Sequence, residues 1–348
     1  MRRQDEEKMT LNEAATAEVM KAHGGAANEF LAPEKLLPNV NGLAVGVKWK
    51  DGEPTGEPAL LVLVTHKVGL DELPKAHQIP KKLAEMQTDV LAIGSPVILP
   101  GEPAEDGSQT LAQRIRPAEA GYSVGHFKIT AGTLGACVYD VLRGGGVSPP
   151  GHGTGIPSRF YILSNNHVLA NGNLAAPGDP ILQPGAFDGG TDPADRIARL
   201  SRFVPIVFGP AGSNLVDAAI AEGAFHDLDR ETYWIGYVDG WRRKSGVTVG
   251  MFVMKTGRTT NFTTGRVTAI SATVTVGGYS GGSARFVDQI VTTAISAGGD
   301  SGSLVLTREA CCRIAIGLLF AGSSVATIVN QIENVRALLR VEVAEAIM

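Results

Sequence analysis

The stretch Gly298-Gly299-Asp300-Ser301-Gly302-Ser303 (GGDSGS) places a serine among glycines, directly before the short apolar run 304–306 (LVL). A serine hydroxyl is a poor nucleophile at its free pKa, so it needs a base to take its proton and donors to hold the oxyanion that its attack creates. Glycines before the serine allow a tight turn that aims consecutive backbone N–H groups at one point. An ordinary turn would fit the same hexapeptide, so its interpretation depends on the rest of the chain.

A histidine and an aspartate with suitable contexts precede the serine. His167 ends the apolar stretch YILSNNHVL (161–169), and it alone among the seven histidines combines a strand end with small polar neighbours. Asp217 leads into the small apolar run DAAIA (217–221), where a lone aspartate is usually a cap or turn residue. The order His167, Asp217, Ser301 makes a catalytic set the better interpretation.

The composition describes an ordinary globular protein rich in turns. The 348 residues are 44% hydrophobic and 19% charged, with a formal net charge of −4, which gives no argument for nucleic acid or an anionic membrane as partner. The 43 glycines and 19 prolines favour short strands over a helical bundle. Three cysteines cannot form a disulfide framework, and neither a signal-like segment nor an 18-residue apolar run is present, so we expect a cytoplasmic protein without a membrane span.

Patterning divides the chain into three expected parts. Residues 1–35 form a polar arm, helical over 11–22 or partly disordered, and residues 36–105 form a small α/β domain. Residues 106–348 form a larger domain of many short strands. In the small domain we expect strands at 43–47, 59–64 and 89–93, a helix at 80–86 and a linker at 100–107. In the larger domain we expect strands at 134–142, 159–164, 217–221, 247–255, 265–269, 272–276, 291–294, 304–306 and 314–320, surface loops at 144–157 and 178–195, and a closing helix over 327–347.

These motifs together resemble the chymotrypsin/trypsin-fold serine peptidases over about residues 121–340. The segment MKTGRTT (254–260), followed by TGRV (264–267), is similar to a motif of the bacterial members. SNNHVLA (164–170) and the small domain that precedes it resemble the narrow-leaf-type branch of plants and bacteria. The resemblance implies a mainly β fold: a chymotrypsin-like double antiparallel β-barrel with a small N-terminal α/β domain and a C-terminal helix.

The resemblance also implies roles for the residues that match. His167 would be the general base, Asp217 would hold its tautomer and Ser301 would be the nucleophile of a serine endopeptidase. The backbone N–H groups of Gly299 and Ser301 would form the oxyanion hole, each donor contributing roughly 3–4 kcal/mol to transition-state stabilisation.

Further matches concern the support of the site. Ser164 matches a position that hydrogen-bonds the buried aspartate, and Phe320, Ala321 and Gly322 match the strand that pairs with the substrate backbone. Phe320 departs from the serine usual in relatives, so either one hydrogen bond to the aspartate is missing or the alignment is shifted. For Asp300 we expect a basic counter-charge, Lys255 or Arg258, with Lys255 as the working hypothesis, and an enzyme that is synthesised active.

Specificity is expected to be apolar. Ile295, six residues before the nucleophile, and its neighbour Ser296 match the base of the primary pocket, and neither is a carboxylate that could receive Lys or Arg. We therefore expect cleavage of proteins or peptides after apolar or small residues.

Other functions remain open at this stage. The chain could be a catalytically silent binding protein on a protease fold, or an esterase that uses the same triad. A phosphate-binding loop at 298–303 would lack the lysine of a P-loop. We expect no metal, no cofactor, no nucleic acid and no membrane partner, and the N-terminal parts could serve homo-oligomerisation.

Overall fold

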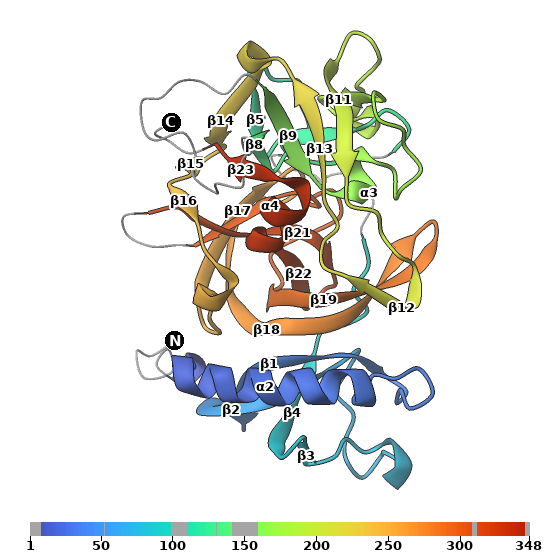
Figure 1. Cartoon of the computed structure of the whole chain (residues 1–348), viewed down its shortest axis with the longest axis vertical. Coiled ribbons are helices and arrows are strands. Elements are labelled where there is room, and N and C mark those ends of the chain that lie inside the picture. Colours follow the sequence, from blue (N-terminus) through green and yellow to red (C-terminus); the bar gives the residue numbers. More distant parts are fainter. Residues whose placement is uncertain are drawn as a thin grey trace.

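A computed structural model describes residues 8–51, 53–98, 110–129, 131–140, 159–307 and 312–344. Strands joined by turns dominate these residues, and helices are few (Figure 1). The mainly β class is therefore confirmed. None of the described helices is long and apolar enough to cross a membrane.

The larger sheet contains twelve of the described strands. Its order is β12-β19-β22-β21-β20-β17-β18-β1-β2-β4-β3, and β16 pairs with β21. Its strands are β1 (Val40–Lys50), β2 (Glu53–Val64), β3 (Lys82–Leu83), β4 (Met86–Ala92), β12 (Gly209–Asn214), β16 (Gly240–Trp241), β17 (Phe252–Gly257), β18 (Asn261–Tyr279), β19 (Gly282–Thr293), β20 (Leu304–Thr307), β21 (Ile314–Gly322) and β22 (Ala326–Gln331).

A second sheet of eight described strands lies above the first in Figure 1, in the order β23-β8-β9-β13-β11-β10-β6-β7. These strands are β6 (Ser123–His126), β7 (Gly132–Thr133), β8 (Ala136–Asp140), β9 (Phe160–Ser164), β10 (Pro180–Leu182), β11 (Arg196–Phe203), β13 (Ala219–Gly223) and β23 (Val341–Val343). A small third sheet joins β5 (Ala118–Ala120), β14 (Leu228–Thr232) and β15 (Gly236–Tyr237). Within the described residues the α-helices with defined bounds are α2 (Glu13–Phe30), α3 (Asn166–Leu169) and α4 (Ile332–Leu339), and the 3-10 helices are η1 (Lys75–His77), η2 (Ala186–Asp188), η3 (Phe225–Asp227) and η4 (Lys244–Gly246).

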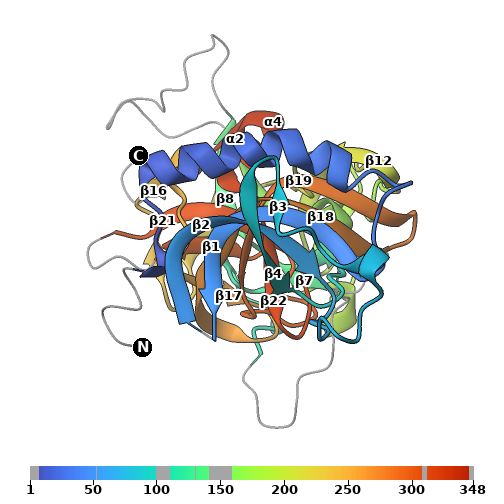
Figure 2. The ribbon, with the colours of Figure 1, turned by 90° about the horizontal axis from the view of Figure 1, so that it is seen from below.

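Helix α2 covers the strands β1 and β2 (Figures 1 and 2). The side chain of Asn12 accepts a hydrogen bond from the N–H of Ala15 at 2.8 Å, which caps the first turn. The helix continues to Phe30, beyond the predicted end at residue 22, because Ala26 and Ala27 pack into the core. The arm thus contributes a docked helix and not a solvated one.

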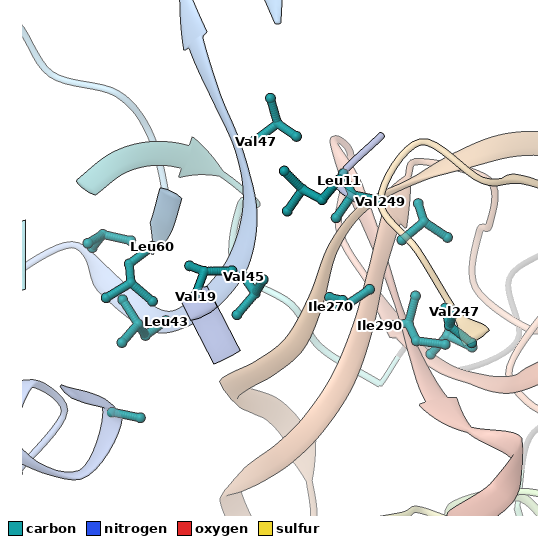
Figure 3. Close-up of a cluster of buried hydrophobic side chains, with 14 of the residues drawn as sticks. Leu11, Val19, Leu43, Val45, Val47, Leu60, Val247, Val249, Ile270 and Ile290 are labelled. Atoms are coloured by element: carbon teal, nitrogen blue, oxygen red, sulfur yellow. The ribbon is translucent and has the colours of Figure 1, made fainter. Parts of the chain in front are cut away.

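The N-terminal strands share both a sheet and a core with the rest of the chain. β1 pairs antiparallel with β18. Figure 3 shows Val19 and Val45 on one side of a continuous apolar cluster, with Ile270 and Ile290 on the other. Burial of such a cluster stabilises by roughly 25 cal/mol per Å² of apolar surface removed from water. The domain boundaries near residues 35 and 105 stay a prediction.

Two predictions from the sequence, at residues 80–86 and 178–195, were wrong in the type of element. Residues 80–86 form no helix: Ala84 and Glu85 both have positive φ, and this turn joins β3 to β4 with Leu83 opposite Met86. The parallel pairing of β4 with β2 overrides the local helical pattern. Residues 178–195 contain the strand β10 and are not only a loop.

The closing segment is likewise not one helix. Residues 326–331 form β22, a central strand buried on both faces, and only Ile332–Leu339 is helical. Arg340, at φ 55°, ends α4 before β23 pairs with β8. The predicted linker at 100–107, the loop at 144–157 and the last residues of the predicted closing helix lie outside the described residues.

Candidate functional site

His167 stands at the end of a completely buried strand. β9 leads through Asn165 into the short helix α3, which carries His167 with only 10% of its side chain exposed. The side chain of Asn165 donates to the carbonyl oxygen of Asp217 at 2.7 Å, so it links the histidine segment to the residue before β13. The sequence pattern of an apolar strand that ends at small polar residues therefore reflects a real anchoring of this turn.

Asp217 is completely buried and faces the histidine. Its Oδ2 accepts from His167 Nδ1 at 2.7 Å, and its Oδ1 accepts from the backbone N–H of His167 at 3.1 Å. A carboxylate oxygen accepts from a ring N–H, so in the neutral imidazole the tautomer that fits this contact has its proton on Nδ1 and its lone pair on Nε2. Nε2 is buried and has no hydrogen-bond partner among the described residues. This arrangement leaves a base with its accepting atom free.

Tyr279, which the sequence analysis missed, completes the surroundings of Asp217. Its hydroxyl donates to Asp217 Oδ2 at 2.7 Å, and its ring meets that of His167 edge-on, with centroids 6.1 Å apart. Burial raises the pKa of Tyr279 well above its usual value, and the negative charge of Asp217 adds to this, so the phenol stays a neutral donor.

Ser164 does not have the role that the resemblance implied. Its hydroxyl donates to the carbonyl oxygen of Thr133 at 2.7 Å, and Tyr279 supplies the hydroxyl that reaches Asp217. Phe320 has no hydroxyl to offer in place of the usual serine, and Tyr279, the last residue of β18, provides the donor to Asp217 instead. The only sequence signal was Tyr279 itself, an aromatic residue within a glycine-rich turn (GGYSGG, 277–282).

Ser301 lies in the turn before β20, and its hydroxyl donates to the carbonyl oxygen of Phe320 at 3.3 Å. Gly302, at φ +99°, has no room for a side chain, since a Cβ would lie 2.1 Å from Ser164 Oγ. The glycine after the serine is thus required by a close approach of the two sheets.

The N–H groups of Gly299 and Ser301 have no backbone acceptor in the described part of the chain. Their neighbours differ, because the N–H groups of Asp300, Gly302 and Ser303 all donate within or close to the turn. Gly299 has φ +95°, a conformation that favours glycine. The turn therefore keeps two donors available at the serine, as an oxyanion hole requires.

Asp300 is buried in a dense set of donors. Its Oδ2 accepts from Lys255 Nζ at 3.0 Å, from Thr260 Oγ1 at 2.6 Å and from the N–H of Ala297 at 3.0 Å. Its Oδ1 accepts from the N–H groups of Thr259 and Thr260 at 2.8 and 3.1 Å. Burial lowers the pKa of Lys255, and the neighbouring carboxylate opposes this shift. The ion pair and the neutral donors together hold the residue directly before Ser301 in place.

Arg258, the other candidate counter-charge, pairs with a different carboxylate. Its Nε donates to Asp188 Oδ2 at 3.0 Å, and its Nη2 also contacts Asp188. Its N–H donates to Thr133 Oγ1, whose hydroxyl in turn donates to the carbonyl oxygen of Gly299 at 2.9 Å. The MKTGRTT segment therefore supports the serine turn through both of its basic residues.

The residues expected at the primary pocket are brought together near β21 and β22. Ile295 is buried, and Ser296 Oγ lies 2.8 Å from Thr327 Oγ1. The Phe320 side chain is also buried, and only its carbonyl oxygen faces the serine. Ala321 pairs with Ile328 of β22. A cavity of about 220 Å³ opens beside His167 and Tyr279, and Ile98 forms part of its wall.

No group of three His, Cys, Asp or Glu side chains that could hold a metal ion lies within the described ranges. The chemistry available at the site is therefore that of a serine, a histidine held by a carboxylate and a pair of backbone donors. This set of groups suits acyl transfer through a covalent intermediate.

Comparisons with known proteins give no family assignment. A scan against protein-family models and a search of curated proteins returned no match. Similar solved structures include Protease A of Thermobifida fusca, at a TM-score of 0.44 and 16% identity, over 66% of this chain and 98% of that one. They also include a chymotrypsin of Cellulomonas bogoriensis (0.42, 17%, 66% and 98%) and a Nocardiopsis protease (0.42, 18%, 65% and 97%). At such low scores and identities these matches carry no argument about activity, and the narrow-leaf branch stays a prediction from the sequence.

Proposed function

We propose that the protein is a serine endopeptidase that forms an acyl-enzyme on Ser301, with His167 as general base and Asp217 as the carboxylate that holds it. One observation carries the proposal: His167 Nδ1 lies 2.7 Å from Asp217 Oδ2, while the buried Nε2 has no hydrogen-bond partner among the residues that the structure describes. A structural histidine with the same burial would be expected to use both ring nitrogens.

The reaction would proceed in two halves. The Ser301 hydroxyl turns from the Phe320 carbonyl to His167, gives its proton to Nε2 and attacks the substrate carbonyl carbon. The N–H groups of Gly299 and Ser301 donate to the oxyanion that forms. When the C–N bond breaks, His167 returns the proton to the leaving amine, and Asp217 stabilises the imidazolium in between.

The second half repeats these steps with water. Water gives a proton to His167 Nε2 and attacks the acyl carbon, and the collapse of the second oxyanion returns the proton to Ser301 and releases the carboxylic acid. The buried Ile295 and the absence of a carboxylate at 295–296 support cleavage after apolar or small residues.

A silent protease-fold binding protein is the second candidate. It is favoured by the observation that the Ser301 hydroxyl bonds to the Phe320 carbonyl and not to His167. A small fluorophosphonate probe distinguishes the two candidates. The proposal expects one probe molecule on Ser301 by intact mass, with no labelling in Ser301→Ala or His167→Ala. Ser283→Ala, at an exposed serine of β19, is the control and should label normally. If the wild-type protein is not labelled, the endopeptidase proposal is wrong.

A further inference from the structure

The segment that follows β4 is paired with the end of β21. The N–H of Val97 donates to the carbonyl oxygen of Gly322 at 3.1 Å, and the N–H of Gly322 donates to the carbonyl oxygen of Val97 at 3.1 Å. The two residues thus form an antiparallel bridge. Val97 therefore acts as a one-residue strand added to the edge of β21.

The same segment is held from its other side by β18. The N–H of Gly277 donates to the carbonyl oxygen of Pro96 at 3.0 Å, and the N–H of Ile98 donates to the carbonyl oxygen of Gly277 at 3.1 Å. A Cβ on Gly278, which has φ +88°, would lie 2.8 Å from the Ile98 carbonyl oxygen, so the backbones are in close contact. Residues 96–98 are therefore clamped between two strand ends.

This clamp lies at the candidate catalytic site. Gly322 is two residues after Phe320, whose carbonyl oxygen accepts from the Ser301 hydroxyl. Ile98 lines the cavity of about 220 Å³ together with His167 and Tyr279. The segment thus occupies the backbone groups of Gly322 and lines the cavity next to the histidine.

Two further contacts hold the segment before it reaches the site. Ser323 Oγ donates to the carbonyl oxygen of Ile93 at 2.6 Å, and Asn41 Nδ2 donates to that of Gly94 at 2.7 Å. The segment thus enters from the N-terminal sheet at a fixed position. Its own covalent attachment gives it a high effective concentration at β21.

An extended peptide that adds to a strand edge needs the same groups. β-strand addition uses the free N–H and C=O of the edge residue, and each backbone N–H supplies a single donor. Because the N–H of Gly322 is already bonded to Val97, a peptide cannot pair there while the segment is in place.

We propose that residues 96–98 occupy the substrate strand position at Gly322, so that the folded protein holds its peptide site in a self-occupied state. A peptide substrate must displace this segment before it can reach Ser301. Ile98, which lines the cavity beside His167, also indicates the substrate class: an extended peptide with a branched apolar side chain at the matching position. The inference rests on the proposed endopeptidase function, and it adds that access of peptides to Ser301 is controlled by residues 96–98.

A pair of substitutions at one position tests the proposal. Val97→Pro removes the N–H that bonds to Gly322 and places the ring against its carbonyl, whereas Val97→Ala keeps the backbone groups. For a peptide substrate with at least four residues before the scissile bond, we expect kcat/KM to rise about tenfold in Val97→Pro, in line with the loss of backbone hydrogen bonds. Val97→Ala should stay close to wild type, and labelling by the small fluorophosphonate should be equal in all three proteins.

Amide hydrogen exchange of the wild-type protein gives a second test that does not depend on the folding of a variant. Reaction with a peptidyl boronate that extends four residues from the boron should increase exchange at residues 97 and 98 at least tenfold and leave exchange in β21 protected. The small fluorophosphonate should leave residues 97 and 98 protected.

The outcomes separate the two proposals. If the small probe fails to label Ser301, the endopeptidase proposal fails and this inference fails with it. If the probe labels Ser301, but a folded Val97→Pro has wild-type kinetics, only the self-occupied site is refuted. Unchanged exchange at residues 97 and 98 after the peptidyl boronate has bound would refute it as well and make the segment a structural connection.

Discussion

Asp217 and Asp300 are both completely buried, and the comparison between them separates two uses of a buried carboxylate. Asp217 accepts from a histidine ring, a histidine N–H and the hydroxyl of Tyr279, none of which has a permanent charge. Asp300 accepts from the ammonium of Lys255 and from four neutral donors. The carboxylate of Asp300 is thus paired with a cation, whereas that of Asp217, within the described part of the chain, accepts only from neutral donors.

The difference follows from what each group must do. A buried charge without a partner costs several kcal/mol, so Asp300 is paired with a cation and serves to hold the serine turn. The side-chain oxygens of Asp217 accept from neutral donors of the described residues, which in the proposed mechanism leaves its charge available for the imidazolium that forms during the reaction. The comparison thus predicts that substitutions at Asp217 lower kcat, whereas substitutions that disturb Asp300 lower the free energy of unfolding.

The largest expected effect is on the rate, in Asp217→Asn. The amide removes the charge and no longer fixes the proton on His167 Nδ1, so we expect kcat to fall by about 10⁴-fold with little change in KM. His126 and Asp179 form a second histidine–aspartate contact, at 3.0 Å, away from the serine. Asp179→Asn is therefore the matched control, and it should keep full activity. A kcat within tenfold of wild type in Asp217→Asn would remove the assigned role.

The next effect is on stability, in Lys255→Met. This change leaves the Asp300 carboxylate buried without its cation, which should lower the free energy of unfolding by about 3–5 kcal/mol in urea denaturation. Lys244 and Asp288 are separated by the same 3.0 Å, but half of the Lys244 side chain is exposed. Lys244→Met should cost less than about 1 kcal/mol. Equal losses in the two variants would contradict the distinction.

Tyr279→Phe should give a smaller effect, again on the rate. Without the Tyr279 donor the Asp217 carboxylate, and with it the His167 ring, is held less firmly in position, and we expect kcat to fall about tenfold. The acid limb of the kcat/KM profile should also move to higher pH, because a carboxylate with fewer donors attracts the imidazolium more strongly. A merely structural tyrosine would not move this limb.

Tyr161 provides the matched control for this variant. Its hydroxyl donates to Asp140 Oδ2 at the same 2.7 Å, so Tyr161→Phe removes an equivalent hydrogen bond elsewhere. We expect Tyr161→Phe to lower the free energy of unfolding and to leave the pH dependence of kcat/KM unchanged. Identical profiles for Tyr279→Phe and Tyr161→Phe would show that Tyr279 does not act through Asp217.

The sequence could predict features that are encoded locally. The apolar strand before His167, the apolar run after Asp217 and the glycine-rich turn at Ser301 are all visible in the sequence. The position of Tyr279 could not be predicted, because it depends on a contact between the end of β18 and Asp217, 62 residues earlier in the chain. The helix predicted over 327–347 is only partly present for a related reason. The apolar residues of this segment suit a helix as well as a strand, and the pairing of β22 with β19 and β21 makes its first part a strand.

A third carboxyl, Glu119, sharpens the comparison because it has neither a cation nor a donor for its side chain in the described structure. Burial raises its pKa to about 7, and Asp229 and Glu231 add to the shift. A carboxyl whose pKa is raised on folding favours the folded state at low pH, and this contribution is lost as the pH rises from about 4.5 to about 7. The carboxyl groups of Asp217 and Asp300 accept hydrogen bonds from several donors, whereas Glu119 is expected to keep a proton up to about pH 7.

Glu119→Gln should therefore raise the melting temperature at pH 8 and leave it unchanged at pH 4, relative to wild type. The gain should be about 1 kcal/mol or less, because water screens a half-buried carboxyl. Glu53→Gln, at an exposed position of β2, is the control and should show no difference between the two pH values. A Glu119→Gln variant that is less stable than wild type at pH 8 would contradict this prediction. It would mean that a contact stabilises the ionised carboxylate of Glu119, so that Glu119 would resemble Asp300.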